Sequence, residues 1–105
     1  MSVIFAYVTT SNPAEAEKIA EIAVRDRLAA CANILPGMVS VYHWDKKIEK
    51  AQESVLLLKT RESLFPALES LIKAHHSYKN PCIAALPVSL ASVAYLDWIL
   101  AETKP

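Results

Sequence analysis

The amino-acid sequence predicts a single α+β domain over residues 1–105, in which two strand–helix–strand units follow one another and a further helix comes last. Three observations predict this class. The length of 105 residues is that of one domain, and 53% of the residues are hydrophobic, which is enough for one core. Short apolar runs of strand length also alternate with longer segments of helical periodicity.

The first two elements are a strand and a helix. Ser2–Thr10 is apolar, rich in β-branched and aromatic residues and too short for a stable helix, which predicts a buried strand. Asn12 is a typical N-cap, Pro13 fits the first helical turn, and Glu15 has the position of a capping-box carboxylate. A helix is therefore predicted from here to about Leu28. Its apolar stripe consists of Ala16, Ile19, Ala20, Ala23 and Val24.

A long β-hairpin is predicted next. The run Val55–Leu58 is apolar throughout, which is typical of a strand buried on both faces and places the third strand in the centre of the sheet. The hairpin is much longer than the usual strand of about 5–6 residues, and Tyr42 and Trp44 lie at its far end, so we expect a partner chain there. Its parts are a strand at Cys31–Leu35, an interruption at Pro36–Gly37, a continuation at Met38–Trp44, a polar turn at Asp45–Lys47 and a third strand at Ile48–Thr60.

The second half of the chain repeats the order of helix and strand. Arg61–Ser63 begins the second helix, with Pro66 in its first turn, and this helix ends near His76. Cys82–Val88 is predicted to be the fourth strand, and Ser92 caps a short last helix. The order β-α-β-β-α-β is that of the ferredoxin-like fold. The anchors of the last helix are Tyr95, Trp98 and Ile99.

Charge and composition exclude several functions. Eleven basic residues balance eleven acidic ones, so the sequence carries neither a basic footprint for nucleic acid nor a polybasic run for a membrane surface. With one glycine, no glycine-rich phosphate loop can be written, and we expect no nucleotide or organic cofactor. No catalytic triad or Cys-His pair can be assigned, so we expect no enzyme. Without an export signal, we expect a cytoplasmic protein in which Cys31 and Cys82 are free thiols.

Two adjacent histidines at the end of the second helix, His75 and His76, are the strongest candidates for metal ligands. Neutral imidazole suits copper (Cu²⁺) or another divalent metal such as zinc, and the thiolate of Cys82 adds a soft donor. Successive helical residues point about 100° apart, so both rings reach one ion only where the helix frays. The alternative is structural: His75 completes the apolar face of the helix, and His76 caps its last carbonyls.

Lys59 and Arg61 end the central strand, where the strand ends of such folds line clefts, and their charges suit an anion. The alternative is that Lys59 pairs with a carboxylate of another subunit and Arg61 with Glu62 or Asp97. For Cys31 a core position is the alternative to a role in the cleft, because free cysteine is among the most buried residue types. The aromatic residues that form either a pocket or plain interface packing are Tyr42, Trp44, Tyr78, Tyr95 and Trp98.

Seven short motifs follow one another along the chain: Arg27–Gly37 (RLAACANILPG), Ser40–Trp44 (SVYHW), Lys47–Glu49 (KIE), Leu57–Arg61 (LLKTR), His75–His76, Ala85–Val88 (ALPV) and Tyr95–Trp98 (YLDW). Together and in this order they resemble the CutA family of divalent-cation tolerance proteins over nearly the whole chain. The resemblance implies a ferredoxin-like subunit in a homotrimer similar in shape to the nitrogen-regulatory PII proteins, with clefts between subunits and Cys31 near a cleft. It also implies a role in tolerance to copper and other divalent metals and no catalytic activity.

The sequence departs from the family pattern at four positions. After the second helix, Lys79 and Cys82 replace two carboxylates that family members commonly have, and a positive charge beside a metal site opposes cation binding. Lys46 stands at the hairpin tip where glycine is usual, so we expect a different turn. Val8 stands where some members have a cysteine that is a proposed copper ligand.

The function predicted from these features is that of a trimeric divalent-cation tolerance protein, which binds copper or another divalent metal or helps the cell respond to it. The alternatives are a PII-like small-molecule sensor, with an anionic metabolite near Lys59 and Arg61, and a structural trimer that docks a protein partner through its hairpin.

Overall fold

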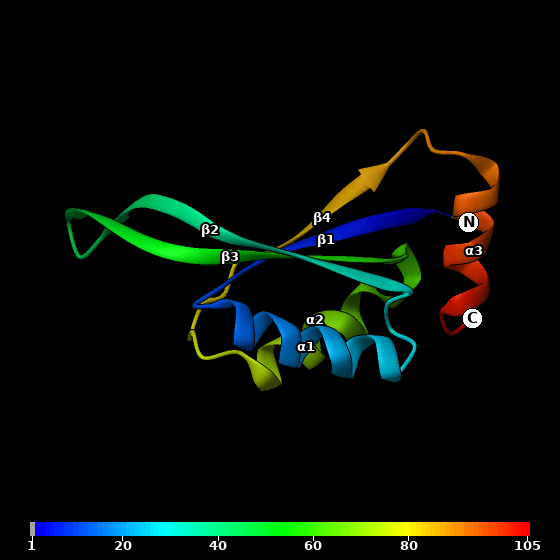
Figure 1. The fold of residues 1–105 in the computed structure, drawn as a ribbon, viewed down its shortest axis with the longest axis horizontal. Helices are drawn as coiled ribbons and strands as arrows, with labels where there is room; N and C mark the ends of the chain where they lie inside the picture. Colours follow the sequence, from blue (N-terminus) through cyan, green and yellow to red (C-terminus); the bar gives the residue numbers. More distant parts are fainter. Residues whose placement is uncertain (1) are drawn as a thin grey trace.

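The computed structural model describes residues 2–105 and has the predicted α+β architecture (Figure 1). No helix within this range combines the length and the apolarity needed to cross a lipid bilayer. The second α-helix begins at Phe65 and not at Arg61–Ser63, as the sequence predicts, because Arg61 still belongs to the third strand and a single-turn 3-10 helix, η1 (Glu62–Leu64), comes next. The other elements are β1 (Val3–Thr10), α1 (Pro13–Arg25), β2 (Cys31–Trp44), β3 (Lys47–Arg61), α2 (Phe65–His75), β4 (Ile83–Val88) and α3 (Val93–Glu102).

The four strands form one antiparallel sheet in the order β2-β3-β1-β4. β3 pairs with both β2 and β1, which confirms the central position predicted from its apolar run. α1 and α2 lie together on one side of the sheet, and α3 stands at one end of it (Figure 1). The order of elements, with both crossover helices on one side, is the ferredoxin-like arrangement that the sequence predicts.

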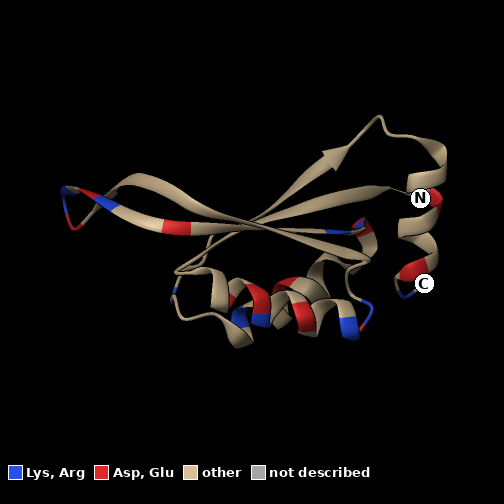
Figure 2. Cartoon of the chain, in the orientation of Figure 1, with Lys and Arg blue, Asp and Glu red and all other residues tan. Residues whose placement is uncertain are grey.

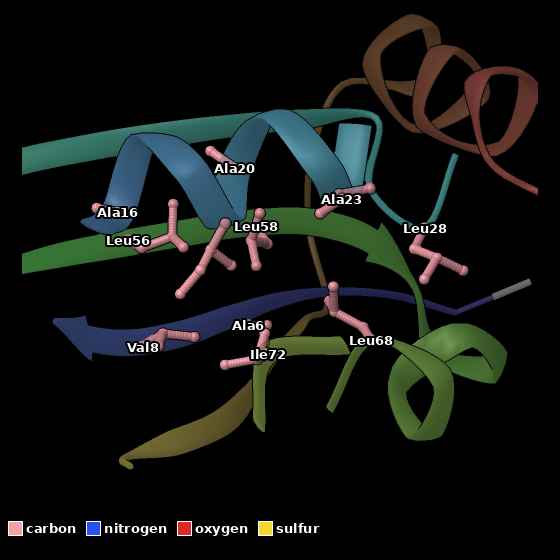
Figure 3. Close-up of a cluster of buried hydrophobic side chains, with 12 residues drawn as sticks. Ala6, Val8, Ala16, Ala20, Ala23, Leu28, Leu56, Leu58, Leu68 and Ile72 are labelled. Atoms are coloured by element: carbon pink, nitrogen blue, oxygen red, sulfur yellow. The ribbon is translucent and has the colours of Figure 1, made fainter. Parts of the chain in front are cut away.

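The core lies between the sheet and the pair α1 and α2 (Figure 3). Side chains alternate along each strand, so Ala6 and Val8 of β1 and Leu56 and Leu58 of β3 are fully buried against the helices. Three alanines on α1 let this helix approach the strands closely, and the larger Ile19 of α1 and side chains of α2 fill the remaining space. The helix residues of the core include Ala16, Ala20 and Ala23 on α1 and Leu68 and Ile72 on α2.

The opposite face of the sheet is covered only in part. One row across the four strands, read from the pairing register, consists of Cys31, Lys59, Phe5 and Leu86. None of these four side chains is fully buried, and Leu86 is 47% exposed. β1 and β4 carry no charged residue at all (Figure 2). The charge on this row therefore comes from Lys59 alone.

The β2–β3 hairpin extends well beyond the helices (Figure 1). Trp44 pairs with Lys47 at its tip, and the two residues between them, Asp45 and Lys46, have φ angles of 50° and 63°. Both angles lie in the left-handed region that a two-residue turn of type I′ requires, so Lys46 adopts a conformation that favours glycine. Four large apolar side chains of the hairpin are 60% exposed or more: Val39, Val41, Trp44 and Ile48.

The expected end of the first helix was wrong by three residues. α1 ends at Arg25, and the backbone N–H groups of Leu28 and Ala29 both return to the carbonyl of Ala23. Arg27 makes this reversal with a φ of 58°. The chain thus turns back without the glycine that most often ends a helix.

Three further expectations are corrected. Pro36–Gly37 does not interrupt the second strand, because β2 runs through it with a register shift between Leu35 and Met38. Such a shift accommodates extra residues while pairing with β3 continues on both sides. Val24, predicted on the apolar stripe of the first helix, is 40% exposed, and Trp98, predicted as an anchor of the last helix, is 42% exposed.

Candidate functional site

His76, a candidate metal ligand, directly follows α2 and is held against β1. Its Nε2 lies 2.8 Å from the carbonyl oxygen of Thr9, and its Nδ1 accepts a 3.0 Å hydrogen bond from the backbone N–H of Tyr78. A carbonyl oxygen can only accept, so Nε2 carries the proton and Nδ1 the lone pair. His76 therefore joins the end of α2 to the end of β1, whereas the structural alternative assigned it to the last carbonyls of α2.

Tyr78 connects the α2–β4 loop (residues 76–82) to the hairpin. Its hydroxyl donates a 2.8 Å hydrogen bond to Oε2 of Glu53 on β3, and its ring lies 4.8 Å from the His76 ring, centroid to centroid. Burial, followed by the hydrogen bond and the negative charge of Glu53, raises the pKa of the Tyr78 hydroxyl well above its usual range. The hydroxyl thus keeps its proton and remains a donor to Glu53.

Glu15 fastens the same loop to the start of α1. The Asn12 side chain caps the helix by accepting a 2.8 Å hydrogen bond from the Glu15 backbone N–H, as predicted. The Glu15 carboxylate accepts from the backbone N–H groups of Ser11, at 3.0 Å, and of Ser77, at 2.8 Å. Burial alone raises the pKa of Glu15, but the hydrogen bonds from Ser11 and Ser77 outweigh it and lower the pKa to about 2.

The other two candidate metal ligands, His75 and Cys82, are exposed at the two ends of this loop. Their donor types suit copper or zinc. Within residues 2–105, however, no three side chains of His, Cys, Asp or Glu gather where they would hold a metal ion. One chain thus supplies suitable donors but fewer than the three or four protein ligands of a typical site.

Two of the departures from the family pattern have clear structural settings. Val8 is fully buried in the core between the sheet and the helices, so its position contributes packing and no ligand atom. Lys79 is exposed in the α2–β4 loop, between His75 and Cys82 in the sequence. Its charge therefore acts on any cation that this loop binds, with the screening expected in solvent.

Lys59 lies on the partly covered face of the sheet, between two aromatic rings. Its Nζ is 5.3 Å from the ring centroid of Phe5 and 5.4 Å from that of Tyr95 on α3, within the range of cation–π attraction. The ion pairs among residues 2–105 join Arg27 to Glu102 and Lys73 to Glu69. Within this part of the chain, Lys59 is therefore left without a carboxylate.

Arg61, the second predicted cleft cation, is buried and serves the fold. Its Nε donates a 3.0 Å hydrogen bond to the hydroxyl of Thr103, and its guanidinium also donates to the carbonyl of Leu100. The partners are thus neither an anion in a cleft nor Glu62 or Asp97, the two alternatives that the sequence offers. Arg61 thus fixes the end of α3 to the end of β3, and its donors are used inside the subunit.

Cys31 lines an open groove of about 520 Å³ between α1, the start of β2 and α3, together with Trp98 and Val24. Trp44 lies at the other end of β2, roughly 40 Å away at about 3.3 Å per residue. A single chain therefore does not bring the predicted cleft residues Cys31, Lys59, Arg61, Trp44 and Tyr78 into one site.

The sequence does not indicate that Thr9 and Glu53 contact the α2–β4 loop, or that the Glu15 carboxylate also binds the backbone N–H of Ser77. Glu15 had a local signal, because its spacing from Asn12 predicts a cap. The contacts to Thr9 and Glu53 span 67 and 25 residues, and nothing in the local sequence indicates them.

These features define a class of protein: a small ferredoxin-like α+β domain with an overlong hairpin, a partly uncovered sheet face and a histidine-bearing loop tied to three other elements. A family profile described as "CutA1 divalent ion tolerance protein" matches residues 4–102. The chain therefore belongs to the CutA1 family, which confirms the resemblance seen in the motifs.

Relatives from distant organisms share this similarity. The chain is 41% identical over 101 residues to "Protein CutA 1, chloroplastic" of Oryza sativa subsp. japonica. The aligned region covers 96% of this chain and 57% of the rice protein. The chain is also 42% identical over 96 residues to "Divalent-cation tolerance protein CutA" of Thermus thermophilus. That aligned region covers 91% of this chain and 93% of the Thermus protein. The chain thus spans little more than half the length of its plant relatives.

Solved structures agree closely with the fold. The crystal structure of CutA1 from Oryza sativa superimposes with a TM-score of 0.96 at 39% identity and covers 99% of this chain and 95% of the rice chain. The structure of the divalent cation tolerance protein from Thermus thermophilus gives a TM-score of 0.94 at 39% identity, with coverage of 97% and 99%. The hairpin and α3 are therefore shared with the family.

Proposed function

We propose that this chain works as a homotrimeric divalent-cation tolerance protein that binds copper or another divalent metal with low affinity and has no catalytic role. The observation that carries the proposal is the setting of His76, whose Nε2–H is fixed on the Thr9 carbonyl while Nδ1 holds the lone pair. Metal-binding histidines almost always donate their other ring N–H to such a partner. Membership in a family described by divalent ion tolerance supports the same role.

His75 and Cys82 are the further donors in the proposed site. His75 is the last residue of α2 and Cys82 ends the α2–β4 loop, and both are exposed, so they are accessible to an ion from solvent. The remaining ligands would be water or side chains of another subunit, since a typical site needs three or four protein ligands. Repulsion by the exposed Lys79 is the reason to expect low affinity.

Assembly is supported by the apolar surface that one chain leaves open. Val39, Val41, Trp44 and Ile48 are exposed on the hairpin, and Leu86 is exposed on the sheet. β2 and β4 are the two edge strands of the sheet, with unpaired backbone groups that favour association. The number three is the one that the family resemblance implies. We place the trimer in the cytoplasm, where its two free thiols would stay reduced.

A copper titration of the tag-free protein tests the metal site, with the mass of the assembly measured in parallel by analytical ultracentrifugation. We expect saturable binding that disappears in the variant His75→Ala/His76→Ala. Unchanged stoichiometry in that variant would remove these residues from the site.

Two matched controls sharpen the titration. His43→Ala removes the third histidine, which lies on the exposed hairpin outside the proposed site, and should leave binding unchanged. Cys82→Ser should weaken binding under reducing conditions, because the soft thiolate donor is lost. Equal binding by the wild type and Cys82→Ser would assign the site to the histidines alone.

A second candidate function rests on Lys59. Its ammonium group lies on the open sheet face with aromatic neighbours, a setting that suits an anionic metabolite in a sensor similar to the PII proteins. Arg61 is not part of this proposed anion site, because its hydrogen-bond donors are taken up by Thr103 and by the Leu100 carbonyl of α3. A thermal-shift screen with inorganic phosphate, nucleotides and dicarboxylates tests it, since a ligand of the folded state raises apparent stability. An anion whose shift disappears in Lys59→Met would support this function, and a flat screen would contradict it.

A further inference from the structure

We propose that a metal ion at His76 competes with the backbone N–H of Tyr78 for the same lone pair, so that metal binding releases the α2–β4 loop from the hairpin. The inference rests on the proposed metal function and adds its regulation: the protein would have a closed, metal-free state and an open, metal-bound one.

The tautomer of His76 determines which nitrogen the metal takes. Nε2 carries the proton and donates it to the Thr9 carbonyl, so its lone pair is absent. Nδ1 has the one available lone pair of the neutral ring, and the Tyr78 N–H donates to it over 3.0 Å. A metal ion that binds Nδ1 must displace this N–H. The bond to Thr9 survives and continues to orient the ring.

Loss of the Tyr78 N–H contact reaches beyond the loop. The same residue packs its ring on His76 and donates its hydroxyl to Glu53 at the stem of the hairpin. An ion on Nδ1 would occupy the place of the Tyr78 backbone, so Tyr78 has to move and its hydroxyl leaves Glu53. The Tyr78–Glu53 bond therefore opposes metal binding, although neither residue is a ligand.

Glu15 defines where the movement stops. Its carboxylate holds the backbone N–H of Ser77 at 2.8 Å, directly after His76. Nothing in the competition at Nδ1 involves this bond. The released part of the chain is therefore expected to begin at Tyr78, with Ser77 still attached to α1.

Zinc is the probe of choice for the test, because Zn²⁺ is diamagnetic and has no redox chemistry. The chain has three histidines, so long-range ¹H–¹⁵N spectra of the imidazoles can be assigned with single substitutions. We expect zinc to shift Nδ1 of His76 while Nε2 keeps its proton. Exchange of the Tyr78 amide hydrogen should become faster at zinc saturation, and exchange of the Ser77 amide should change little.

The variant Tyr78→Phe provides the decisive comparison. It removes one hydrogen bond that holds the loop closed and leaves every proposed ligand in place. We therefore expect zinc to bind about threefold to tenfold more tightly to Tyr78→Phe than to the wild type, the value of one ordinary hydrogen bond. Tyr42→Phe, which changes an exposed tyrosine of the hairpin, is the matched control and should bind as the wild type does.

The outcomes separate this inference from the proposed function. If His76→Ala abolishes zinc binding but Tyr78→Phe binds like the wild type with its Tyr78 amide still protected, the competition is refuted and the metal function stands. If zinc binds equally well to His76→Ala, the proposed metal site itself is refuted, and the competition with it.

Discussion

Arg61 and Thr103 are 42 residues apart in the sequence, yet the Nε of Arg61 donates a 3.0 Å hydrogen bond to the Thr103 hydroxyl. Thr103 in turn donates to the carbonyl of Ile99 at 2.9 Å, and the guanidinium also donates to the carbonyl of Leu100. These carbonyls belong to the last turn of α3, which lacks intrahelical donors and carries partial negative charge. A buried cation thus completes the C-terminal end of the helix.

Replacing Arg61 with Met should therefore destabilise the fold. The substitution keeps much of the apolar stem but removes the donors, and it leaves the Thr103 hydroxyl and the Leu100 carbonyl short of a partner. We expect the free energy of unfolding to fall by about 2–4 kcal/mol. Urea unfolding at a fixed protein concentration measures it. Arg25→Met, at an exposed position of α1, is the control, and an equal effect of the two variants would contradict the role of Arg61.

The stability of the fold should depend on acid through Glu15. Its pKa is about 2 in the folded protein and ordinarily 4.5, so folding favours the ionised carboxylate. The stabilisation is complete above pH 4.5 and is lost as the pH falls from 4.5 towards 2. After allowance for solvent screening, we expect Glu15→Gln to lower the free energy of unfolding at neutral pH by about 1–2 kcal/mol.

The pH dependence separates this effect from simple loss of a contact. The difference in unfolding free energy between the wild type and Glu15→Gln should shrink as the pH approaches 2. Glu17→Gln, an exposed position on the same helix, should show no such convergence. A difference that stays constant with pH would show that the charge of Glu15 contributes little.

The hairpin tip should gain stability from glycine at position 46. Lys46 has a φ of 63°, which costs a residue with a side chain about 1–2 kcal/mol, whereas glycine loses only about 0.5–1 kcal/mol in chain entropy. We expect Lys46→Gly to raise the free energy of unfolding by roughly 0.5–1 kcal/mol. Lys47→Gly, one residue further and within β3, should lower it. The same sign in both variants would rule out strain at Lys46.

The exposed valines of β2 should matter for assembly more than for folding of the subunit. Val39 and Val41 are each 60% exposed and lie on one face of the hairpin. Val39→Thr/Val41→Thr keeps the branched shape that suits a strand but removes apolar surface. We expect the association free energy to weaken by roughly 1 kcal/mol per side chain. Sedimentation equilibrium measures it, with Ser40→Thr as the control. Equal association of both variants would place these valines outside the interface.

Local signals predicted the elements of the fold well. Asn12 and Pro13 marked the start of α1, and the unbroken apolar run of β3 marked a central strand, because both depend on neighbouring residues alone. The end of α1 was misplaced because the chain reverses at Arg27, and an arginine carries no stop signal of the kind that glycine gives. The shift at Pro36–Gly37 was misread because pairing with β3 continues on both sides of it.

The candidate site was less predictable than the fold. His76 could be selected by its chemistry, but the direction of its lone pair depends on Thr9 and Tyr78, and the first of these lies 67 residues away. Arg61 was assigned to a cleft because of its charge at a strand end. Arg61 is buried because the end of α3 packs against it, and no residue near position 61 in the sequence indicates that contact.

The sheet order also sets the sequence of events while the protein is being synthesised. β1 is made before the other three strands but is an interior strand, with β3 on one side and β4 on the other. Its pairing with β3 is complete only after residue 61 has been made, and its pairing with β4 only after residue 88. A nascent chain therefore holds an apolar strand with at least one incompletely paired edge until residue 88 has been made. Native folding and faulty pairing between neighbouring nascent chains compete during that interval.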